Sequence, residues 1–405
     1  MNYSIIAPNH INEKKILTAK TLSPFSEVVL DFIDAVSTRI INDTSLDKYP
    51  ELKAMAFWMR KKHIKKLKIE FESKKNDRIC VPRGIAFHIT PSNVDTIFVY
   101  SWFISMMLGN INIIRLSNNE NEQLIILINI LKGLLEKNEF ETIKNRVLLI
   151  RYPHDDAITR YFSSLCDMRI IWGGDETIHK IRLIPLKSTG IDITFGDKFS
   201  FSIINASYFL ALNEKINCID SFYNDAFWFS QMACSSPKLI IWVGNHETTR
   251  QAKKIFWQLL EQLVIEKNKE FVSVSAINKH VAAYALAIQH PVKIQETKTN
   301  LIHRILLNHY SEINEELHCG AGLFYELNIK ELNEIAPFIL RKHQTASILG
   351  FNKHEIKEFV LNNSVSGIDR FVPIGKALEF SQVWDGIDLF TSLTRVIDVS
   401  MINIC

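Results

Sequence analysis

The sequence predicts an α/β protein with two doubly wound lobes and a small C-terminal segment. Its 405 residues exceed what a single hydrophobic core usually holds, so two large domains are expected. From Ile85 onward, short apolar runs alternate with longer amphipathic runs, a pattern typical of parallel strands connected by helices. The composition, 47% hydrophobic and 22% charged, indicates a packed globular chain rather than a disordered or fibrous one.

A helical segment is expected before the first sheet, up to about residue 75. Apolar residues recur there at helical spacing, in Phe25-Val29-Phe32-Ile33-Val36 and again in Leu52-Met55-Trp58-Met59. The alternating pattern then predicts strands at Ile85–Ile89, Ile111–Arg115, Val147–Arg151 and Met168–Trp172, and helices at Ile97–Leu108, Glu122–Glu136, Asp155–Leu165 and from Gly173 through Ile181. This is the pattern of a doubly wound nucleotide-binding sheet, and we assign residues 1–205 to it together with the preceding helices.

A second α/β unit is expected over residues 206–380. After the run Ser202–Asn205, the pattern predicts a helix near Ser221–Gln231, a strand at Leu239–Val243 and a long helix through Val264. The tail, residues 381–405, contains the β-like run Val396–Val399. Since such a strand can pair with the sheet of another subunit, we predict a C-terminal oligomerisation segment and a homo-oligomer.

Charge and cysteine usage restrict the partners and the compartment. The formal net charge is only +3, so nothing indicates a nucleic-acid partner. The six cysteines are widely spaced, which predicts a reduced, cytoplasmic protein. We expect neither a signal peptide nor a membrane span, because the longest apolar stretch, Ile97–Leu108, is too short to cross a bilayer. The histidines do not occur at metal-ligand spacing, so no metal site is expected.

Cys234 is the candidate nucleophile. It lies in Ala233-Cys234-Ser235-Ser236-Pro237, between a predicted helix and a predicted buried strand, and its small neighbours leave room for a substrate. A thiolate is a strong nucleophile that can form a thioester and so divide one difficult substitution into two easier ones. Taken alone, the spacing favours a buried structural cysteine, and we assign Cys166, Cys218 and Cys319 to that structural class.

Further candidates follow the predicted strands of the first sheet, where ligands of parallel sheets bind. Thr90 and Pro91 follow the strand Ile85–Ile89, and the side-chain amide of Asn93 can face a developing oxyanion or simply form a turn. Arg115 and Ser117 can contact an adenosine ribose and its 2′-phosphate, although a surface ion pair also explains Arg115. Gly173-Gly174-Asp175 before a helix suits a pyrophosphate, without the full glycine spacing of a dinucleotide motif.

Taken in order, these motifs resemble the aldehyde dehydrogenase superfamily and, more narrowly, the LuxC-type fatty acyl-CoA reductase family, from about Val81 to the C-terminus. The resemblance rests on Pro82-x-Gly84-x6-Pro91-x-Asn93, Gly109-Asn110, Trp172-Gly173-Gly174-Asp175, Phe195-Gly196-Asp197-Lys198-Phe199-Ser200, Gln231-x-Ala233-Cys234 and Lys342-His343-Gln344-Thr345. It implies an aldehyde-dehydrogenase-like fold of two Rossmann-like lobes, with Cys234 as nucleophile, Asn93 at the oxyanion, and a cofactor held by Thr90, Pro91, Arg115, Ser117, Gly173, Gly174 and Asp175.

The activity implied by the resemblance is NADPH-dependent reduction of an acyl group to the aldehyde. The acyl group reaches Cys234 from acyl-CoA or from a partner acyl-activating synthetase or acyltransferase, and hydride transfer follows. Oxidising members carry a Glu where this chain has Thr194, so the base that activates water is absent and reduction of thioesters fits better than formation of acids. The alternatives are an NAD(P)-dependent aldehyde dehydrogenase and a noncatalytic scaffold for an acyl-activating enzyme. The Glu-x-Phe-Gly-Pro motif of oxidising members is also absent, and the corresponding region reads Glu316-Leu317-His318-Cys319-Gly320-Ala321.

Overall fold

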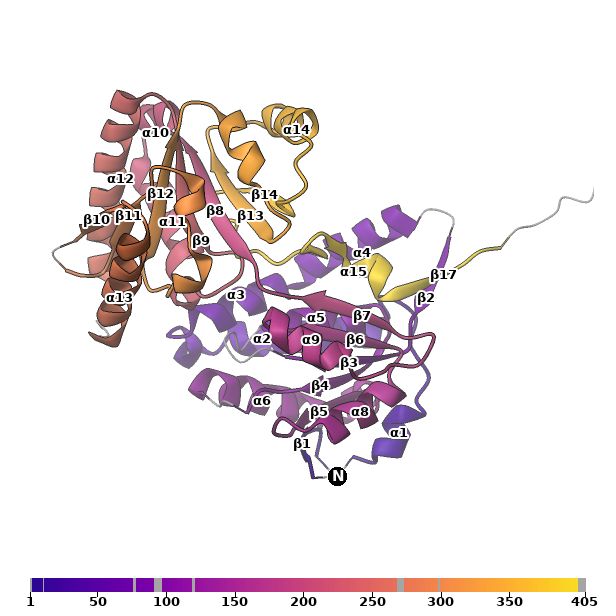
Figure 1. The fold of residues 1–405 in the computed structure, drawn as a ribbon. Helices are drawn as coiled ribbons and strands as arrows, with labels where there is room; N and C mark the ends of the chain where they lie inside the picture. The colour runs from indigo at the N-terminus through magenta and orange to yellow at the C-terminus, as the bar shows by residue number, and fades with distance from the viewer. Residues whose placement is uncertain are drawn as a thin grey trace, which may run out of the picture. The chain divides into compact units, whose positions relative to one another are not determined.

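A computed structural model describes residues 2–9, 11–75, 78–90, 97–118, 121–267, 273–297 and 299–399 (Figure 1). The chain forms two compact units, the first from residues 1–196 together with 380–405 and the second from residues 197–379. The sequence prediction placed the division after residue 205. In the structure the strand that ends at Asn205 belongs to the second sheet, so the division falls between Gly196 and Asp197.

The first unit contains a six-stranded sheet with the order β1-β5-β4-β3-β6-β7. Five strands run parallel, and only the edge strand β1 is antiparallel to its neighbour. Four of these strands confirm the predicted bounds: β3 (Ile85–Ile89), β4 (Ile111–Arg115), β5 (Val147–Arg151) and β6 (Met168–Trp172), to which the structure adds β1 (Ser4–Ala7) and β7 (Ile191–Phe195). The chain order reverses between β3 and β6, which makes the carboxyl ends of these two strands the topological switch point of the sheet.

Helices cover both faces of this sheet. Successive side chains of each strand are buried on opposite faces of the sheet. Ile114, for example, belongs to one core cluster and Ile113 to the other. The first cluster takes its helices from α2 (Glu27–Ile41), α3 (Pro50–Trp58), α4 (Lys61–Lys75), α5 (Ile97–Met107), α6 (Glu122–Leu135) and α7 (Glu141–Lys144). The second takes them from α1 (Glu13–Leu17), α8 (Asp156–Leu165) and α9 (Asp175–Arg182). The predicted doubly wound pattern is therefore confirmed.

Asn110 organises the start of the sheet, which explains the paired Pro-x-Gly and Gly-Asn motifs. Its Oδ1 accepts hydrogen bonds from the backbone N–H of Arg83 at 2.9 Å and of Gly84 at 3.1 Å. Its Nδ2 donates to the carbonyls of Ser105 at 3.2 Å and Leu393 at 3.0 Å. Gly109 has φ +86°, and a Cβ there would collide with the carbonyl oxygen of Leu22. These motif residues are therefore structural in this unit.

The C-terminal segment pairs within its own chain over the described residues. Strand β17 (Thr394–Ile397) is antiparallel to β2 (Ile79–Pro82), and Arg83 donates hydrogen bonds to the carbonyls of Ser392 and Thr394. The short helix α15 (Leu389–Ser392) and the two-stranded ribbon of β15 (Val383–Trp384) and β16 (Ile387–Asp388) lie in the same unit. Val396 and Ile397 remain 50% and 42% exposed, and their pairing with another subunit stays a prediction.

The second unit contains a seven-stranded sheet with the order β10-β11-β12-β9-β8-β13-β14, in which only the edge strand β10 is antiparallel. The strands are β8 (Phe199–Asn205), β9 (Pro237–Val243), β10 (Lys293–Glu296), β11 (His303–Leu306), β12 (Leu323–Ile329), β13 (His343–Leu349) and β14 (Arg370–Pro373). One core cluster packs α10 (Ala206–Ala211), α11 (Lys215–Phe227) and α12 (His246–Lys267) on the sheet, and the other packs α13 (Ser273–Gln289) and α14 (Lys353–Asn362).

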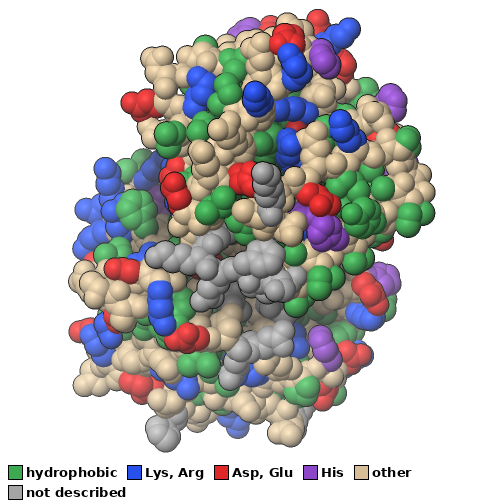
Figure 2. Space-filling view, turned by 90° about the vertical axis from the view of Figure 1, so that its left-hand side faces the viewer, with side chains coloured by type: hydrophobic (Ala, Val, Ile, Leu, Met, Phe, Trp, Pro, Cys, Tyr) green, Lys and Arg blue, Asp and Glu red, His purple; other side chains and the backbone are tan. Residues whose placement is uncertain are grey.

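Helix α13 buries only part of its apolar surface against this sheet. Ala283 and Leu286 are fully buried, whereas five apolar side chains are more than half exposed, namely Val274, Ile277, Val281, Tyr284 and Ile288. Figure 2 shows the side of the molecule on which α13 lies in Figure 1, and hydrophobic side chains are among those at its surface. Within the described part of the chain, none of the helices is long and apolar enough to cross a membrane.

Burial of His88 in the middle of β3 predicts an acid-sensitive first unit. The ring is fully buried, its Nε2 lies 3.0 Å from Asn112 Oδ1, and burial lowers its pKa from 6.5 to about 4. Between these two values the unfolded chain binds the proton and the folded chain does not, so the free energy of unfolding falls as the pH falls. At pH 5 this loss amounts to about 2 kcal/mol relative to pH 7.

The variant His88→Gln, which does not titrate, tests this expectation by urea unfolding at pH 7 and pH 5. The free energy of unfolding should fall more steeply toward pH 5 in the wild-type protein than in the variant. Equal slopes in the two proteins would show that His88 is not the responsible group.

Candidate active site

Cys234 lies in a short loop that enters β9 in the second unit. The side chain is partly exposed, while the following residues Ser235 and Ser236 are buried. Ser200, at the start of β8, donates a hydrogen bond from its Oγ to the carbonyl of Cys234 at 2.6 Å, and its Oγ accepts one from the backbone N–H of Thr345 at 3.1 Å. Ser200 thereby joins the cysteine loop to two strands, which accounts for two of the motifs noted in the sequence.

Three residues before the cysteine loop have left-handed backbone conformations. The φ angles of Phe229, Ser230 and Gln231 are 53°, 51° and 64°. Such conformations are unfavourable for side chains other than glycine and persist only where surrounding contacts impose them. The turn brings the chain from the end of α11 into the loop, so its contacts determine where Cys234 lies.

Gln231 supplies those contacts. It is fully buried, and its Nε2 donates hydrogen bonds to the carbonyls of Pro237 and Leu323, both at 2.9 Å. Its Oε1 accepts a hydrogen bond from the backbone N–H of Gly322 at 3.0 Å. One side chain therefore links both ends of the cysteine loop to the segment before β12.

The segment His318–Leu323 is the second support of the loop. The backbone N–H of Ala321 donates to the carbonyl of Ser230 at 2.9 Å, and a Cβ at Gly320 would lie only 2.6 Å from that same carbonyl oxygen. His318 is held between the Gly320 N–H, which its Nδ1 accepts at 3.2 Å, and the Leu323 carbonyl, to which its Nε2 donates at 2.8 Å. This region, where a nicotinamide-ribose carboxylate was sought in the sequence, instead supports the cysteine loop.

A half-buried lysine, Lys238, provides positive charge near Cys234. Burial lowers the pKa of Lys238, and the negative charges of Cys234, Glu315 and Asp197 oppose that shift. A neighbouring ammonium favours the thiolate form of a cysteine. Lys198 has a different role, because its Nζ lies 3.0 Å from the buried carboxylate of Asp369 and is thus committed to an ion pair.

The other cysteines in the described ranges, apart from Cys80, have surroundings that disfavour the thiolate. Burial raises the pKa of Cys166 to about 12 and that of Cys218 to about 11, and it also raises the pKa of Cys319. Cys166 is buried as expected, whereas Cys218 and Cys319 are only half-buried because they lie at the edges of their core clusters. Cys405 lies outside the described residues.

The predicted cofactor residues lie in the first unit, at the carboxyl ends of β3, β4 and β6. Thr90 follows β3 at the switch point, and its Oγ1 donates a hydrogen bond to the carbonyl of Arg115 at 2.9 Å. Ile89 is in register with Arg115 on one side and with Ile171 on the other, so these strand ends share one edge of the sheet. Pro91 and Asn93 lie outside the described residues.

Arg115 is held at that edge by Tyr152. Its guanidinium lies over the ring of Tyr152, with its carbon 4.8 Å from the ring centroid, and its Nη2 donates to the Tyr152 carbonyl at 3.5 Å. Its buried Nε has no hydrogen-bond partner within the described part of the chain. The carbonyl of Ser117 accepts a hydrogen bond from Arg151 at 3.0 Å. The arrangement leaves a cationic donor beside the switch point, as a bound phosphate would require.

Gly173 and Gly174 lie at the end of β6, and Gly174 is the N-cap of α9. The backbone N–H of Gly173 donates to the carbonyl of Phe195 at 3.1 Å. Asp175 and Glu176 place two acidic side chains in the first turn of the helix, and Glu176 is paired with Lys180. These residues lie where the prediction places a pyrophosphate, at the N-terminus of a helix. The two acidic side chains, however, would repel the negative charge of a pyrophosphate.

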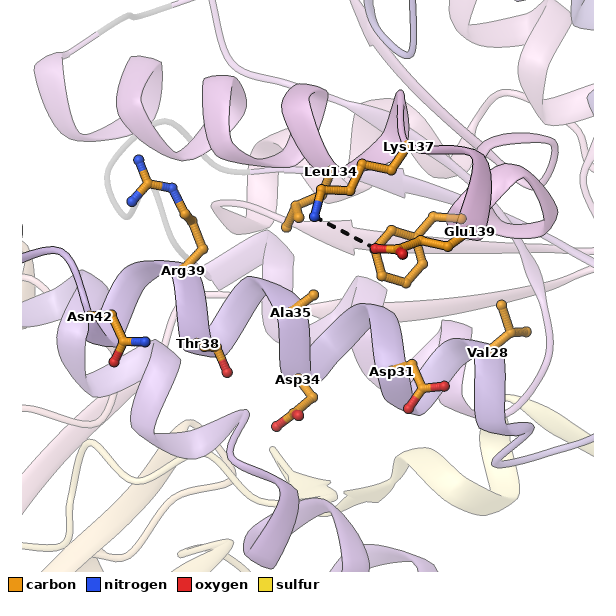
Figure 3. Close-up of a pocket in the computed structure, with 11 residues that line it drawn as sticks. Val28, Asp31, Asp34, Ala35, Thr38, Arg39, Asn42, Leu134, Lys137 and Glu139 are labelled. Atoms are coloured by element: carbon orange, nitrogen blue, oxygen red, sulfur yellow. Dashed lines mark ion pairs between the residues drawn. The ribbon is translucent and has the colours of Figure 1, made fainter.

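A separate hollow of about 710 Å³ lies on the first unit beside α2 (Figure 3). It is lined by Val28, Asp31, Asp34, Ala35, Thr38, Arg39, Asn42, Leu134, Lys137, Glu139 and Phe140. Lys137 and Glu139 form an ion pair of 3.6 Å at its margin. Because its described lining holds neither a thiol nor an imidazole, we assign it no part in the chemistry of Cys234.

Sequence reasoning missed two residues of the cysteine site. Gln231 was recognised only as part of a motif, and Lys238 was not singled out. For Gln231 the available signal was its position: it is a polar residue between two apolar segments, three positions before the cysteine. For Lys238 no signal existed, since only its partial burial near Cys234 distinguishes it from a surface lysine.

The fold is that of the aldehyde dehydrogenases. Solved structures of that fold superpose on most of the chain. They include aldehyde dehydrogenase 21 from Physcomitrella patens in complex with succinate (TM-score 0.65, 10% identity, 93% of this chain and 86% of that one). The glyceraldehyde-3-phosphate dehydrogenase of Methanocaldococcus jannaschii complexed with NADP gives a TM-score of 0.63 at 12% identity, with 92% and 88% covered. An oxidoreductase from Marinobacter aquaeolei superposes with a TM-score of 0.66 at 8% identity, and the match covers 93% of this chain and 86% of that one.

Within that class, the chain belongs to the acyl-CoA reductase (LuxC) family, whose model matches residues 51–396. The resemblance noted in the sequence is thus confirmed at the level of both family and fold. A search of curated proteins gave no match.

Proposed function

We propose that the protein reduces an acyl thioester to an aldehyde through an acyl group bound covalently to Cys234, with NADPH as reductant. The observation that carries the proposal is the setting of Cys234: a partly exposed thiol on a loop that Ser200 and Gln231 hold by hydrogen bonds, near a half-buried lysine. The acyl donor is acyl-CoA or the acyl group of a partner acyl-activating or acyl-transferring enzyme.

The proposed reaction has two stages. In the first, the Cys234 sulfur attacks the thioester carbonyl, a new carbon–sulfur bond forms, and the bond to the coenzyme A sulfur breaks; that sulfur leaves as a thiolate and takes up a proton. In the second, two electrons and a proton reach the acyl carbon as hydride, and the carbonyl oxygen takes up a proton. Cleavage of the carbon–sulfur bond then releases the aldehyde and returns the cysteine.

The chain's own residues supply position and charge for these stages. Ser200 binds the carbonyl of Cys234, and Gln231 links both ends of the cysteine loop to the segment before β12. The thiol is therefore positioned before the substrate binds. The Lys238 ammonium favours the thiolate both before attack and after the aldehyde leaves. The side-chain amide of Asn93 is the proposed donor to the oxyanion, as the family resemblance implies.

The first unit is the proposed binding site of the cofactor. A nicotinamide cofactor bound there would supply the hydride. The fit rests on Arg115, whose buried Nε lacks a hydrogen-bond partner among the described residues, at the carboxyl end of β4 and next to the switch point. A 2′-phosphate would satisfy that cation, which favours NADPH over NADH. Thr90, Pro91, Ser117, Gly173, Gly174 and Asp175 complete the proposed site.

Removal of the Arg115 guanidinium should weaken NADPH specifically. For Arg115→Leu we expect kcat/KM for NADPH to fall by about tenfold to a hundredfold, because charge-assisted hydrogen bonds contribute about 1.5–3 kcal/mol. The value for NADH should change little. Arg160→Leu, at an exposed arginine of α8, is the matched control. Equal losses with both cofactors would contradict a 2′-phosphate contact at Arg115.

Intact-mass spectrometry tests the proposed function directly. Incubation with acyl-CoA and no cofactor should add one acyl mass at Cys234, and later addition of NADPH should remove it with release of aldehyde. Steady NADP⁺-dependent production of free acid from an aldehyde, without coenzyme A, would favour an aldehyde dehydrogenase instead. Failure to bind either acyl group or cofactor, together with stable association with an acyl-activating enzyme, would favour a scaffold.

A further inference from the structure

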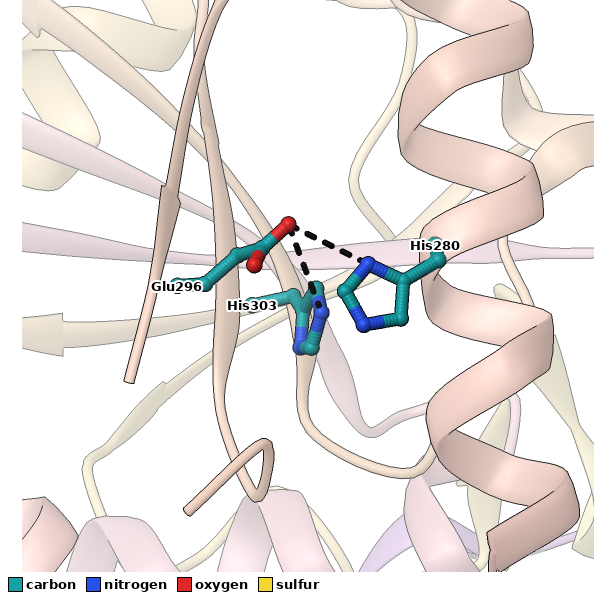
Figure 4. A group of neighbouring side chains, drawn as sticks. All are labelled: His280, Glu296 and His303. Atoms are coloured by element: carbon teal, nitrogen blue, oxygen red, sulfur yellow. Dashed lines mark ion pairs between the residues drawn. The ribbon is translucent and has the colours of Figure 1, made fainter. Parts of the chain in front are cut away.

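Two histidines and a glutamate meet at one edge of the second sheet (Figure 4). Glu296 of β10 and His303 of β11 are directly opposite each other in the antiparallel register, so both side chains lie on the same face of the sheet. Helix α13 packs against β10 and contributes His280. The potential ligand atoms of the three side chains all lie within 4.8 Å of one another.

The Glu296 carboxylate lies close to both histidine rings. Glu296 Oε1 lies 3.2 Å from His280 Nδ1 and 3.9 Å from His303 Nε2. The two imidazole rings meet edge to face, with centroids 4.6 Å apart. His280 and Glu296 are about one third exposed, at 31% and 32%, so ions can reach the cluster from solvent and both side chains can turn.

His303 is the observation that points to a ligand. The residue is fully buried, and neither of its ring nitrogens has a hydrogen-bond partner within the described ranges. An unsatisfied buried polar group is destabilising, and buried imidazoles in proteins are ordinarily hydrogen-bonded or bound to a metal. The Glu296 carboxylate is too distant to satisfy it by a hydrogen bond.

The neighbouring lysine does not block a cation. Lys279 precedes His280, but its Nζ donates hydrogen bonds to three backbone carbonyls, those of Asn300 at 2.7 Å and of Leu301 and Ala321 at 2.9 Å. Its charge is therefore engaged by carbonyl dipoles. Tyr284, one turn further along α13, stacks on the other side of His280 with centroids 6.0 Å apart.

We infer that His280, Glu296 and His303 form a binding site for a divalent transition metal, with zinc as the ion that the ligand set favours. Two imidazoles and one carboxylate are a common zinc ligand set and leave a fourth position for water. Ligand atoms around tetrahedral zinc lie about 3.3 Å apart, so small rotations of the partly exposed side chains of His280 and Glu296 close the site. The inference does not depend on the proposed reaction of Cys234.

The site would reinforce the edge of the second sheet. A bound ion ties α13 to β10 and β11, and Lys279 on the same helix holds Ala321, whose N–H in turn bonds Ser230 before the cysteine loop. Metal binding is therefore expected to raise the thermal stability of the chain. The sequence spacing of the three residues matches no metal motif, which is why the histidine pattern predicted no metal site.

Metal-free full-length protein tests the inference by titration with zinc against a chromophoric chelator. We expect one zinc per chain with a dissociation constant in the micromolar range or below, and a weakening by at least about tenfold in His280→Gln, Glu296→Gln and His303→Asn. His354→Gln is the matched control, because His354 forms a 3.4 Å pair with Glu358 on the surface of α14 without a third ligand. Zinc should raise the Tm of the wild type and the control but not of the three variants.

Cobalt(II) spectra separate this site from the thiols, because thiolate ligation gives intense charge-transfer absorption and nitrogen and oxygen ligation does not. Absence of binding in the wild type, binding that persists in the variants, or a thiolate spectrum would each overturn the inference. Should His303→Asn fail to fold, the variants at the partly exposed His280 and Glu296 decide the outcome. Acylation of Cys234 is measured separately, so failure of one proposal leaves the other testable.

Discussion

Replacement of Cys234 by alanine is expected to lower acyl-CoA-dependent NADPH consumption by at least about a thousandfold, since loss of a covalent nucleophile removes the whole reaction path. The variant should also show no acyl adduct by intact mass. The reason lies in the loop, where Cys234 is the thiol placed beside the Lys238 ammonium. Stopped-flow measurement of NADPH consumption, with single turnover and steady state compared, checks the rate.

Cysteine variants elsewhere in the second unit serve as controls. Cys218→Ala and Cys319→Ala remove half-buried thiols whose pKa is raised by burial, so both enzymes should retain most of their activity and their acyl adduct. An acyl adduct that survives in Cys234→Ala but disappears in Cys319→Ala would identify Cys319 as the nucleophile and refute the proposed assignment.

Gln231→Ala is expected to reduce kcat by about a hundredfold while leaving KM for acyl-CoA nearly unchanged. The variant removes the three hydrogen bonds that connect Pro237, Gly322 and Leu323, and displacement of a reacting group by about 1 Å costs on that order. The left-handed turn at Phe229 and Ser230 should relax once that support is lost.

A second readout distinguishes positioning from general destabilisation. The alkylation rate of Cys234 with a small thiol reagent should remain close to wild type in Gln231→Ala, because the thiol persists while its placement is lost. Gln251→Ala, at an exposed amide of α12, is the matched control and should change neither kcat nor Tm. If the loss of activity equals the fraction of unfolded protein at the assay temperature, Gln231 has a purely structural role.

The strands of the first sheet could be predicted closely because their signal is local. β3, β4, β5 and β6 begin and end at the predicted residues, since each is a short apolar run between polar segments. The strands β1, β2 and β7 and the first residues of β8 were not predicted. Their pairing partners are remote in the chain or lie at sheet edges, and their sequences carry little periodicity.

The sequence alone determined the α/β class, the family, the candidate nucleophile and the strand ends that carry the proposed cofactor residues, because short apolar runs and contiguous motifs record these locally. Tertiary structure alone decided that Gln231 holds the cysteine loop, that Lys238 lies beside Cys234, and that His280, Glu296 and His303 meet. Each of those relations joins residues through burial or cross-strand register, and neither quantity can be read from the order of the residues along the chain.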